Sequence, residues 1–249
     1  MSAVRIIACL DTRRGRVVKG IGFSDLVECG DPIERAYTYY ADGADEITVL
    51  DVEATPASQR FASEMLTNMT RKVFVPICAG GGIRTIEDFR AVLRAGADKV
   101  SICSAALSHP ELLTDAGTEF GSQCVVLSLD ARRCESGWEA FTAGGRTNSG
   151  RDAIEWAKEA EARGAGEILV NSIDNDGTGA GYDLALLQAV RKAVRIPIIA
   201  SGGGGSLESM YEAVGAGADA ILVASVLHKG TYSIRDIKAF LTMKGVEVR

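Results

Sequence analysis

Two aspartates, Asp11 and Asp130, are the strongest candidates for acid and base chemistry in this chain of 249 residues. The chain has only two histidines: His109 precedes a proline near a predicted helix start, and His228 follows the last apolar run. We expect neither to catalyse, so general acid and base work falls to carboxylates. Each of the two aspartates ends an apolar run, "RIIACLD" and "VVLSLD". The sequence therefore predicts an acid and base pair in one site, although an aspartate at a strand end can also cap the following turn.

Two glycine runs predict binding sites for anions. Gly202 and Gly203 belong to "ASGGGGS", and Gly81 and Gly82 belong to "AGGGI"; each run lies between a predicted strand and a predicted helix. Backbone N–H groups at a helix N-terminus bind phosphate where no side chain covers them. Small residues after the next strand are expected to complete each site, namely Cys103 and Ser104 in one and Ala224 and Ser225 in the other. One glycine run could be only a tight turn, but two matching runs favour two phosphate sites.

Three further polar side chains are expected near the same site. Asp51 ends the second apolar run, and Asp176 with Gly177 belongs to "SIDNDGT" after the sixth run. Lys19 lies in a long polar loop predicted over 12–30. It is the one nearby base expected to approach an anionic substrate, although a loop lysine is solvated by default.

Eight short apolar runs predict the strands that position these residues. They cover residues 5–10, 46–50, 73–78, 99–103, 124–129, 167–171, 196–200 and 220–224. Amphipathic segments such as 85–94 and 206–215 separate them, and a mobile loop is predicted over 142–152. Eight strands that alternate with helices predict an α/β fold, a (β/α)8 TIM barrel over 1–249, rather than a doubly wound open sheet. In such a barrel strands one and five lie opposite each other, so both aspartates face one mouth.

An internal repeat divides the predicted barrel into two similar (βα)4 halves. "VPICAGGGIRTIEDFRAVLRAGADKVSICSAAL" from Val75 matches "IPIIASGGGGSLESMYEAVGAGADAILVASVL" from Ile196, which is an offset of 121 residues. The halves are approximately 1–120 and 121–249. Because the second glycine run repeats the first at this offset, it is not expected to be a domain linker.

Composition excludes several classes of partner. The net charge is -6, and no stretch gathers Lys and Arg densely enough for a nucleic-acid surface. No apolar run approaches the roughly 18 residues of a membrane-spanning helix, and no secretory signal opens the chain. The six cysteines have neither CxxC pairing nor histidines at metal-ligand spacing. We expect a reduced, cytoplasmic protein with no metal site and no nucleic-acid or membrane partner.

Several motifs that occur in order resemble those of a known family. They are "RIIACLD", "GRVVKG", "GADKVS", "GAGEILVNSIDNDGT", "IPIIASGG" and the terminal "GVEVR". Their combination resembles the cyclase subunit of imidazole glycerol phosphate synthase, from histidine biosynthesis. The resemblance implies a lyase that takes a bisphosphorylated ribulosyl aminoimidazole carboxamide (PRFAR) and ammonia to imidazole glycerol phosphate and AICAR, with no metal or redox cofactor. It implies Asp11 and Asp130 as acid and base, with Lys19 on the substrate loop.

The same resemblance gives a role to charged residues at the opposite end of the barrel. Taken alone, charge at the starts of barrel strands indicates stability or solvation. In the family a charged ring at this end gates a passage for ammonia, which is made by a glutaminase subunit docked on this face. The resemblance therefore implies a heterodimer with a glutamine amidotransferase. The residues carried over are Arg5, Glu46, Lys99 and Glu167 for the gate and Asp98 for the contact.

Three positions depart from the family pattern. Cys103 stands where an asparagine is usual, Gly204 replaces a usual alanine, and Glu53 stands where a small hydroxyl residue is common. Another carboxylate near the mouth disfavours a dianionic substrate unless it turns away. Three alternatives stay open: the isomerase that precedes this step, a noncatalytic barrel that activates a glutaminase, and a cyclase-like protein that acts in amidation of cell-surface sugars.

Overall fold

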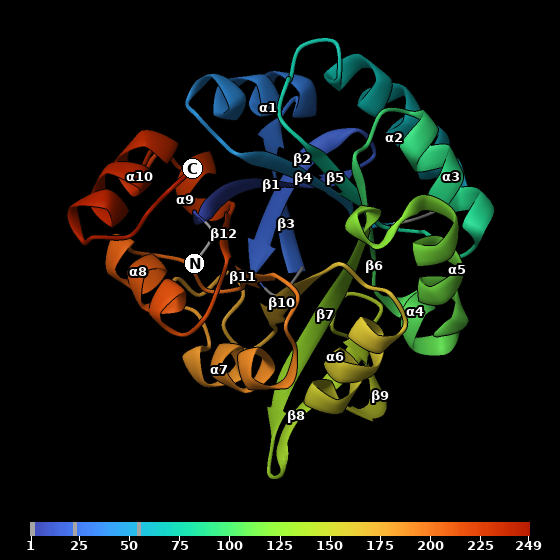
Figure 1. Ribbon diagram of the computed structural model, residues 1–249. Coiled ribbons are helices and arrows are strands. Elements are labelled where there is room, and N and C mark those ends of the chain that lie inside the picture. Colours follow the sequence, from blue (N-terminus) through green and yellow to red (C-terminus); the bar gives the residue numbers. More distant parts are fainter. Residues whose placement is uncertain (1–2, 22–23, 54–55) are drawn as a thin grey trace.

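Eight parallel strands close into a barrel in the computed structural model, which describes residues 3–21, 24–53 and 56–249 (Figure 1). In order around the barrel they are β1 (Arg5–Arg13), β4 (Glu46–Asp51), β5 (Ile77–Gly80), β6 (Lys99–Ile102), β7 (Val125–Cys134), β10 (Glu167–Ser172), β11 (Ile198–Ser201) and β12 (Ala220–Val223). The last strand pairs with the first, with Ile221 opposite Ile6, so the barrel is closed. The prediction of a (β/α)8 barrel is confirmed.

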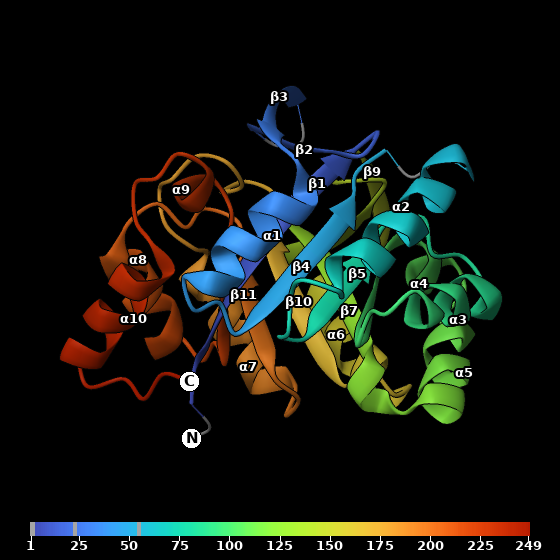
Figure 2. The same cartoon turned by 90° about the horizontal axis from the view of Figure 1, so that it is seen from above.

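Helices cover the outside of this barrel (Figures 1 and 2). The long ones are α1 (Pro32–Ala41), α2 (Pro56–Met69), α3 (Ile86–Arg94), α5 (Glu111–Phe120), α6 (Ala153–Ala162), α7 (Leu184–Ala193), α8 (Leu207–Gly215) and α10 (Ile234–Met243). Two short helices, α4 (Ser104–Ser108) and α9 (Ser225–His228), directly follow β6 and β12, and a 3-10 turn, η1 (Ser122–Cys124), precedes β7. None of the helices in the described ranges has the length and apolar character needed to cross a membrane.

The two amphipathic helices predicted from the sequence begin where their caps require. Thr85 accepts a hydrogen bond from the backbone N–H of Asp88, and the Asp88 carboxylate accepts one from the N–H of Thr85 in return. Ser206 starts α8 with the same arrangement, in which Ser209 takes the place of the aspartate. These capping boxes satisfy backbone N–H groups that the first turn of a helix leaves free.

Antiparallel hairpins stand where the sequence predicted the loops 12–30 and 142–152, so those two predictions were wrong. The strands are β2 (Arg16–Ile21) and β3 (Ser24–Gly30), which extend β1, and β8 (Gly137–Thr142) and β9 (Thr147–Asp152), which extend β7. Figure 2 shows β2 and β3 beyond the end of the barrel that lies away from the C-terminus. Both hairpins therefore rise from the carboxyl ends of barrel strands.

Turn geometry explains the first hairpin. Arg14 and Gly15 are the two residues between β1 and β2, and both have positive φ, 50° and 74°. A two-residue hairpin turn with this backbone matches the twist of its strands. The following Val17 and Val18 are buried, which anchors the hairpin to the core.

Two strands begin later than the apolar runs predicted. The prediction of a strand at 73–78 fails because Phe74 is 75% exposed and the ladder begins at Ile77. Pro76 has no N–H to donate, and only its carbonyl joins the sheet, accepting from the backbone N–H of Ile47. The run at 196–200 shifts for the same reason, since Pro197 precedes β11.

Side chains inside the barrel form layers along its axis. Because side chains alternate along a strand, Arg5, Ile7, Cys9 and Asp11 of β1 share the inward face. The middle layers are filled by Ile7, Cys9, Cys78, Val126, Leu169, Ile199, Ala220 and Leu222. This apolar plug separates charged residues at the strand starts from polar residues at the strand ends.

Candidate functional site

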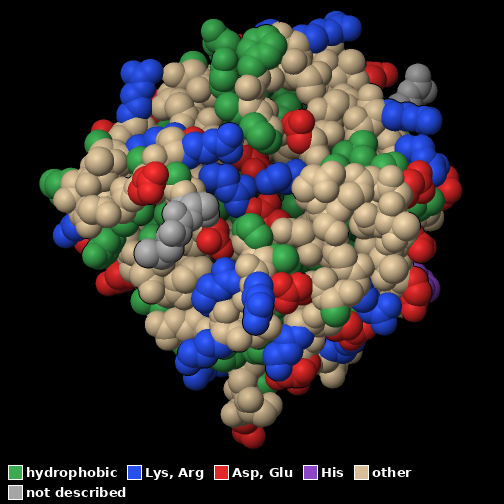
Figure 3. All heavy atoms as spheres, in the orientation of Figure 1, with side chains coloured by type: hydrophobic (Ala, Val, Ile, Leu, Met, Phe, Trp, Pro, Cys, Tyr) green, Lys and Arg blue, Asp and Glu red, His purple; other side chains and the backbone are tan. Residues whose placement is uncertain are grey.

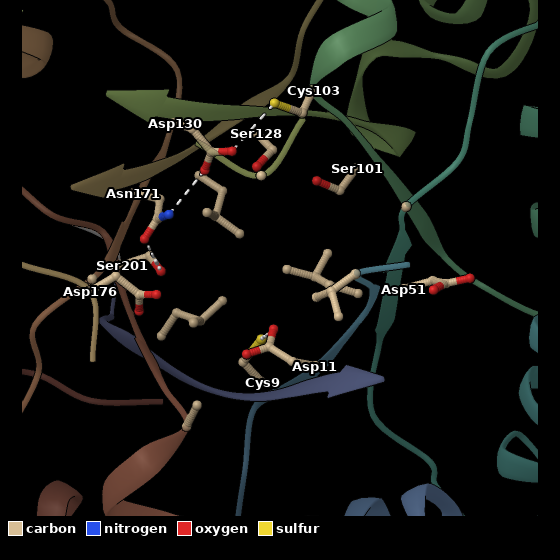
Figure 4. A pocket seen from close by; sticks show the side chains of 18 of the residues that line it. Cys9, Asp11, Asp51, Ser101, Cys103, Ser128, Asp130, Asn171, Asp176 and Ser201 are labelled. Carbon is tan, nitrogen blue, oxygen red and sulfur yellow. Dashed lines mark hydrogen bonds between the residues drawn. The ribbon is translucent and has the colours of Figure 1, made fainter. Parts of the chain in front are cut away.

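A cavity of about 1110 Å³ opens at the carboxyl ends of the barrel strands. Every residue that the sequence predicted for catalysis or substrate binding lines it: Asp11, Lys19, Asp51, Gly81, Gly82, Cys103, Ser104, Asp130, Asp176, Gly177, Gly202, Gly203, Ala224 and Ser225. Figure 4 shows Asp11 and Asp130 on opposite sides of this space. The fold thus brings residues from many strand ends into one mouth.

Asp11 faces inward near the carboxyl end of β1, beside a lysine from β2. The Nζ atom of Lys19 lies 3.0 Å from Oδ2 of Asp11 and 3.7 Å from Oδ1 of Asp176. Burial by itself lowers the pKa of Lys19, but the two carboxylates outweigh burial and raise its pKa above the ordinary value. Lys19 is therefore a permanent cation and the counter-ion of Asp11.

Asp130 has a different environment at the end of β7. Nδ2 of Asn171 donates to its Oδ1 at 2.9 Å, and the thiol of Cys103 donates to its Oδ2 across 3.7 Å. Burial raises the pKa of Asp130 above the ordinary value, against the effect of these two hydrogen bonds. Since both donors are neutral, Asp130 keeps a proton to higher pH than an exposed aspartate does.

Two more carboxyl groups border the cavity. Asp176 is buried, and its Oδ2 has no hydrogen-bond partner among the described residues. Burial raises the pKa of Asp176, although Lys19 opposes this. Asp51 lies farther out (Figure 4), where its Oδ1 accepts from the backbone N–H of Glu53 at 3.0 Å. Asp176 is thus the third carboxyl group beside the catalytic candidates, whereas Asp51 borders a glycine turn.

The two glycine runs form matching concave surfaces. We call Gly81, Gly82, Cys103 and Ser104 the first cup, and Gly202, Gly203, Ala224 and Ser225 the second cup. Gly81 and Gly202 have φ of 98° and 81°. A Cβ on Gly81 would collide with the carbonyl oxygen of Asp51, and one on Gly202 would lie 2.6 Å from that of Ser172. Glycine is required at both positions by backbone conformation and by space.

A short helix begins in each cup without a side-chain cap from any described residue. The capping positions are Cys103 for α4 and Ala224 for α9. Ser104 instead accepts from the backbone N–H of Ala143 at 3.0 Å, which joins the β8–β9 turn to the first cup. Uncapped first-turn N–H groups at a mouth are suited to hold an anion.

Sequence reasoning missed two residues that support Asp130. Oγ of Ser201 donates to Oδ1 of Asn171 at 3.3 Å, which fixes the amide so that Nδ2 faces Asp130. Figure 4 shows this chain of side chains along one wall. Period-two alternation could have found Asn171, because it shares the inward face of β10 with Glu167.

Sequence reasoning also missed basic side chains at the rim. Arg13, Arg84, Arg146 and Lys229 all line the cavity and are all exposed. They lie far apart along the chain, so no charge run marks them. Their positive charge favours the approach of an anionic substrate to a mouth that holds several carboxylates.

Glu53 turns its charge toward a neighbour instead of the cavity centre. Its two carboxylate oxygens each accept from Arg14 at 3.1 Å, one from Nε and one from Nη2. This two-point contact balances the carboxylate that the family pattern lacks. Glu53 lines the cavity, and its pairing with Arg14 reduces the repulsion that it would exert on a dianionic substrate.

The two histidines lie near the mouth, and that neither of them catalyses stays a prediction. His109 is exposed at the cavity rim. His228 is half-buried, and burial lowers its pKa to about 4. Neither contacts the carboxyl group of Asp11 or Asp130 through a hydrogen bond within the described residues.

A closed ring of charges lies at the other end of the barrel. Arg5 bonds Glu46 at 2.9 Å and also bonds Glu167, while Lys99 bonds Glu46 at 2.7 Å and Glu167 at 2.8 Å. Burial raises the pKa of Glu46, although Lys99 and Arg5 lower it. Figure 3 shows basic and acidic side chains together at the centre of this face, on which the C-terminus lies. Asp98 is exposed on the same face and accepts from the backbone N–H of Ile77 at 2.8 Å.

Comparison with known proteins agrees with this geometry. The family model described as "Histidine biosynthesis protein" matches residues 5–233. A curated relative from Beutenbergia cavernae, "Imidazole glycerol phosphate synthase subunit HisF", is 53% identical over 253 residues, which cover 99% of each chain. A relative of the same name from Mycobacterium tuberculosis is 51% identical over 254 residues, which cover 99% of this chain and 95% of the relative.

Proposed function

This chain belongs to the histidine biosynthesis protein family, and we propose that it is a cyclase subunit of imidazole glycerol phosphate synthase, a lyase. It converts PRFAR and ammonia to imidazole glycerol phosphate and AICAR. The observation that carries the proposal is one mouth in which Asp11 and Asp130 face each other between two glycine cups. The opposed carboxyl groups supply acid and base, and the cups supply the substrate contacts.

The size and symmetry of the mouth suit a substrate with a phosphate at each end. The cups follow β5 and β6 on one side and β11 and β12 on the other, so they lie across the barrel from each other. Each offers backbone N–H groups that no side chain covers. A bisphosphate held at both ends has its reacting centre between the two aspartates, which is the orientation that makes the reaction effectively unimolecular.

Different surroundings divide the proton transfers between the aspartates. Addition of ammonia to a carbonyl carbon leaves negative charge on the oxygen and positive charge on the nitrogen. Asp130, whose pKa is raised by burial, donates the proton to oxygen as general acid. Asp11, bonded to the Lys19 ammonium, removes a proton from nitrogen as general base. The same pair serves the later ring closure and C–N cleavage with the proton positions exchanged.

A direct assay tests the function. Purified protein is incubated with PRFAR and an ammonium salt, and loss of PRFAR absorbance is followed while imidazole glycerol phosphate and AICAR are identified as products. We expect turnover that depends on ammonium. Absence of turnover would refute the cyclase proposal, and ammonia-independent rearrangement of the precursor of PRFAR would identify the isomerase instead.

Glu53 and Arg14 provide a test of charge balance at the mouth. We expect Glu53→Gln to change KM for PRFAR by less than about twofold, because the lost carboxylate was already paired and exposed pairs contribute little. Arg14→Gln should raise KM about threefold at low salt, since it leaves the Glu53 carboxylate unpaired beside a dianion. The double variant should return to the wild-type KM; a double variant as weak as Arg14→Gln would contradict this explanation.

We also propose a heterodimer with a glutaminase that docks on the face of the charged ring. Support comes from exposed aromatic side chains: Phe74, which precedes the start of β5, is 75% exposed, and Tyr37 of α1 is 47% exposed. Tyr40 joins them, with its ring 6.3 Å from Tyr37 and 6.1 Å from Phe74. Hydrophobic side chains over α1 are visible at the edge of this face in Figure 3. Aromatic anchors near a charged centre are typical of protein interfaces.

The aromatic group gives a partner-specific prediction. Phe74→Ser should weaken binding of the cognate glutaminase by at least about tenfold, as loss of an aromatic anchor does. Turnover with ammonium salt should not change, because Phe74 is remote from the mouth. Tyr211→Ser, on the flank helix α8, is the control. The measurement is calorimetric titration together with glutamine-dependent turnover; no complex with wild-type protein would refute the partner proposal.

Two further lines complete the proposal. The hairpins β2–β3 and β8–β9 follow the first and fifth barrel strands, which supports one domain built from two (βα)4 halves of about 1–120 and 121–249. All six cysteines are free thiols, which supports a reducing compartment and hence the cytoplasm.

A further inference from the structure

A buried polar pair lies behind the second cup. Tyr39 of α1 is 4% exposed, and its hydroxyl oxygen lies 2.6 Å from Nδ1 of His228, the last residue of α9. The two rings are 5.8 Å apart. Neither side chain lines the mouth cavity formed by the described residues. The pair therefore lies outside the cavity, where it joins α1 to the end of α9.

The short helix α9 needs such a contact. It has four residues and no side-chain cap within the described part of the chain, and so short a helix has little stability of its own. Its first residue, Ser225, belongs to the second cup, whereas its last residue bonds to Tyr39. The direction of the N–H groups in the cup is therefore set by packing of Val226 and Leu227, which are buried, and by the Tyr39 contact.

The hydrogen bond persists over the working pH range. Burial lowers the pKa of His228 to about 4, with Lys19 and Arg35 adding to this and Asp11 opposing it. The imidazole is neutral at neutral pH, and its other nitrogen, Nε2, has no partner among the described residues. The contact with Tyr39 is thus its single hydrogen bond in that part of the chain.

Tyr39 interacts with Arg35, so it also links the cup to the hairpin that carries Lys19. Arg35, one turn earlier in α1, donates from Nε to the carbonyl oxygen of Cys29 at 2.8 Å. Cys29 belongs to β3, and β3 pairs with β2, where Lys19 lies opposite Val27. One connected set of contacts therefore runs from Lys19 through α1 to α9.

The fold itself does not demand a polar pair here. At the offset of 121 residues that relates the two predicted halves, the positions equivalent to Tyr39 and His228 are Ala160 and Leu107. Both are apolar and belong to the core packing. The half-barrel architecture can therefore be built at these positions with apolar side chains alone.

We propose that Tyr39 is a positioning residue, whose hydrogen bond to His228 orients α9 so that the first-turn N–H groups of the second cup meet one phosphate group of the substrate. The inference rests on the proposed function only for the identity of that substrate. The positioning of a phosphate by the cup can be measured without turnover.

The test compares Tyr39→Phe with Tyr40→Phe, a neighbouring tyrosine packed on Phe74. Inorganic phosphate is titrated into each folded protein, and kcat and KM for PRFAR are measured from pH 6 to 9. Tyr39→Phe should weaken phosphate at one of two sites and raise KM by about threefold to tenfold, the effect of one hydrogen bond. We expect kcat to stay within about twofold, the KM ratio to be constant across this pH range, and Tyr40→Phe to match wild type.

A double-mutant cycle separates positioning from general loss of packing. If both residues act through one bond, His228→Phe alone and the double variant with Tyr39→Phe should show the same KM as Tyr39→Phe. An unchanged KM and phosphate affinity in Tyr39→Phe, additive effects in the double variant, or an equal effect of Tyr40→Phe would overturn the inference. If the wild-type protein binds phosphate at two sites but does not turn over PRFAR, the proposed function is refuted. The role of Tyr39 is then still decided by the phosphate affinity of Tyr39→Phe.

Discussion

Asp130→Asn should lower kcat for PRFAR and ammonium by at least about 100-fold, because an amide can neither donate nor accept the transferred proton. Asp11→Asn should have an effect of the same order, since it removes the base and leaves Asp176 as the one carboxylate among the described residues that pairs with Lys19. KM should change much less in both variants, because the cups are untouched. Steady-state kinetics with ammonium salt measure both effects, and Asp115→Asn, exposed on α5, is the matched control.

Asp130→Asn should also make the protein more stable at neutral pH. The pKa of Asp130 is raised by folding, so the protonated form is favoured in the folded state. Its contribution to the free energy of unfolding is full below the ordinary aspartate pKa, about 3.9, and is lost as pH rises through the raised value. Asp130→Asn removes the cost of the buried charge, so its Tm should exceed that of wild type at pH 7.5 but not at pH 4. Turnover above one tenth of wild type would contradict the catalytic assignment, and a lower Tm at pH 7.5 would contradict the account of its burial.

Gly81→Ala should raise KM for PRFAR by at least about 100-fold or abolish measurable turnover. Gly81 has a φ of 98°, and a Cβ there meets the backbone of Asp51. A left-handed backbone costs a non-glycine residue roughly 1–2 kcal/mol. The collision with Asp51 adds to this cost, because it can be relieved only if the end of β4 or β5 moves. Because the first cup is made of this backbone, its N–H groups move with it.

Gly43→Ala is a closely matched control for the backbone term. Gly43 also has a φ of 98°, and a Cβ there meets nothing within 4 Å. This variant should lose stability by the conformational cost alone and keep its KM. Thermal unfolding and steady-state kinetics on both variants separate strain from loss of the cup. A KM within twofold of wild type in Gly81→Ala would show that the first cup does not hold the substrate.

The barrel and its mouth could be predicted from the sequence because the determining signals are local. Each barrel strand carries its own apolar run, and each cup carries its own glycines, so Asp11 and Asp130 needed only the strand order to be placed opposite each other. The role of the charged ring at the strand starts was predicted from the family resemblance. Nothing in the sequence around Arg5, Glu46 and Lys99 indicates that their side chains form ion pairs with one another.

What the sequence did not yield depends on contacts between distant segments. The loop prediction over 12–30 overlooked the apolar pair Val17 and Val18, which the structure buries, and Arg14–Gly15 is not one of the common hairpin dipeptides. Alternation along β10 places Asn171 on the inward face, but its hydrogen bond to Asp130, 41 residues away, is visible only in the structure. The Tyr39–His228 contact joins residues 189 positions apart, and no local pattern reports it.

The ring at the strand starts has a kinetic consequence. Each carboxylate in it bonds both cations, and each cation bonds both carboxylates, so no member can swing aside without breaking two ion pairs at once. Partial opening would leave buried charges half-solvated, which is costly. We therefore expect the four side chains to separate together rather than one at a time, so passage of water or ammonium through this end of an isolated chain should be rare compared with passage through the mouth.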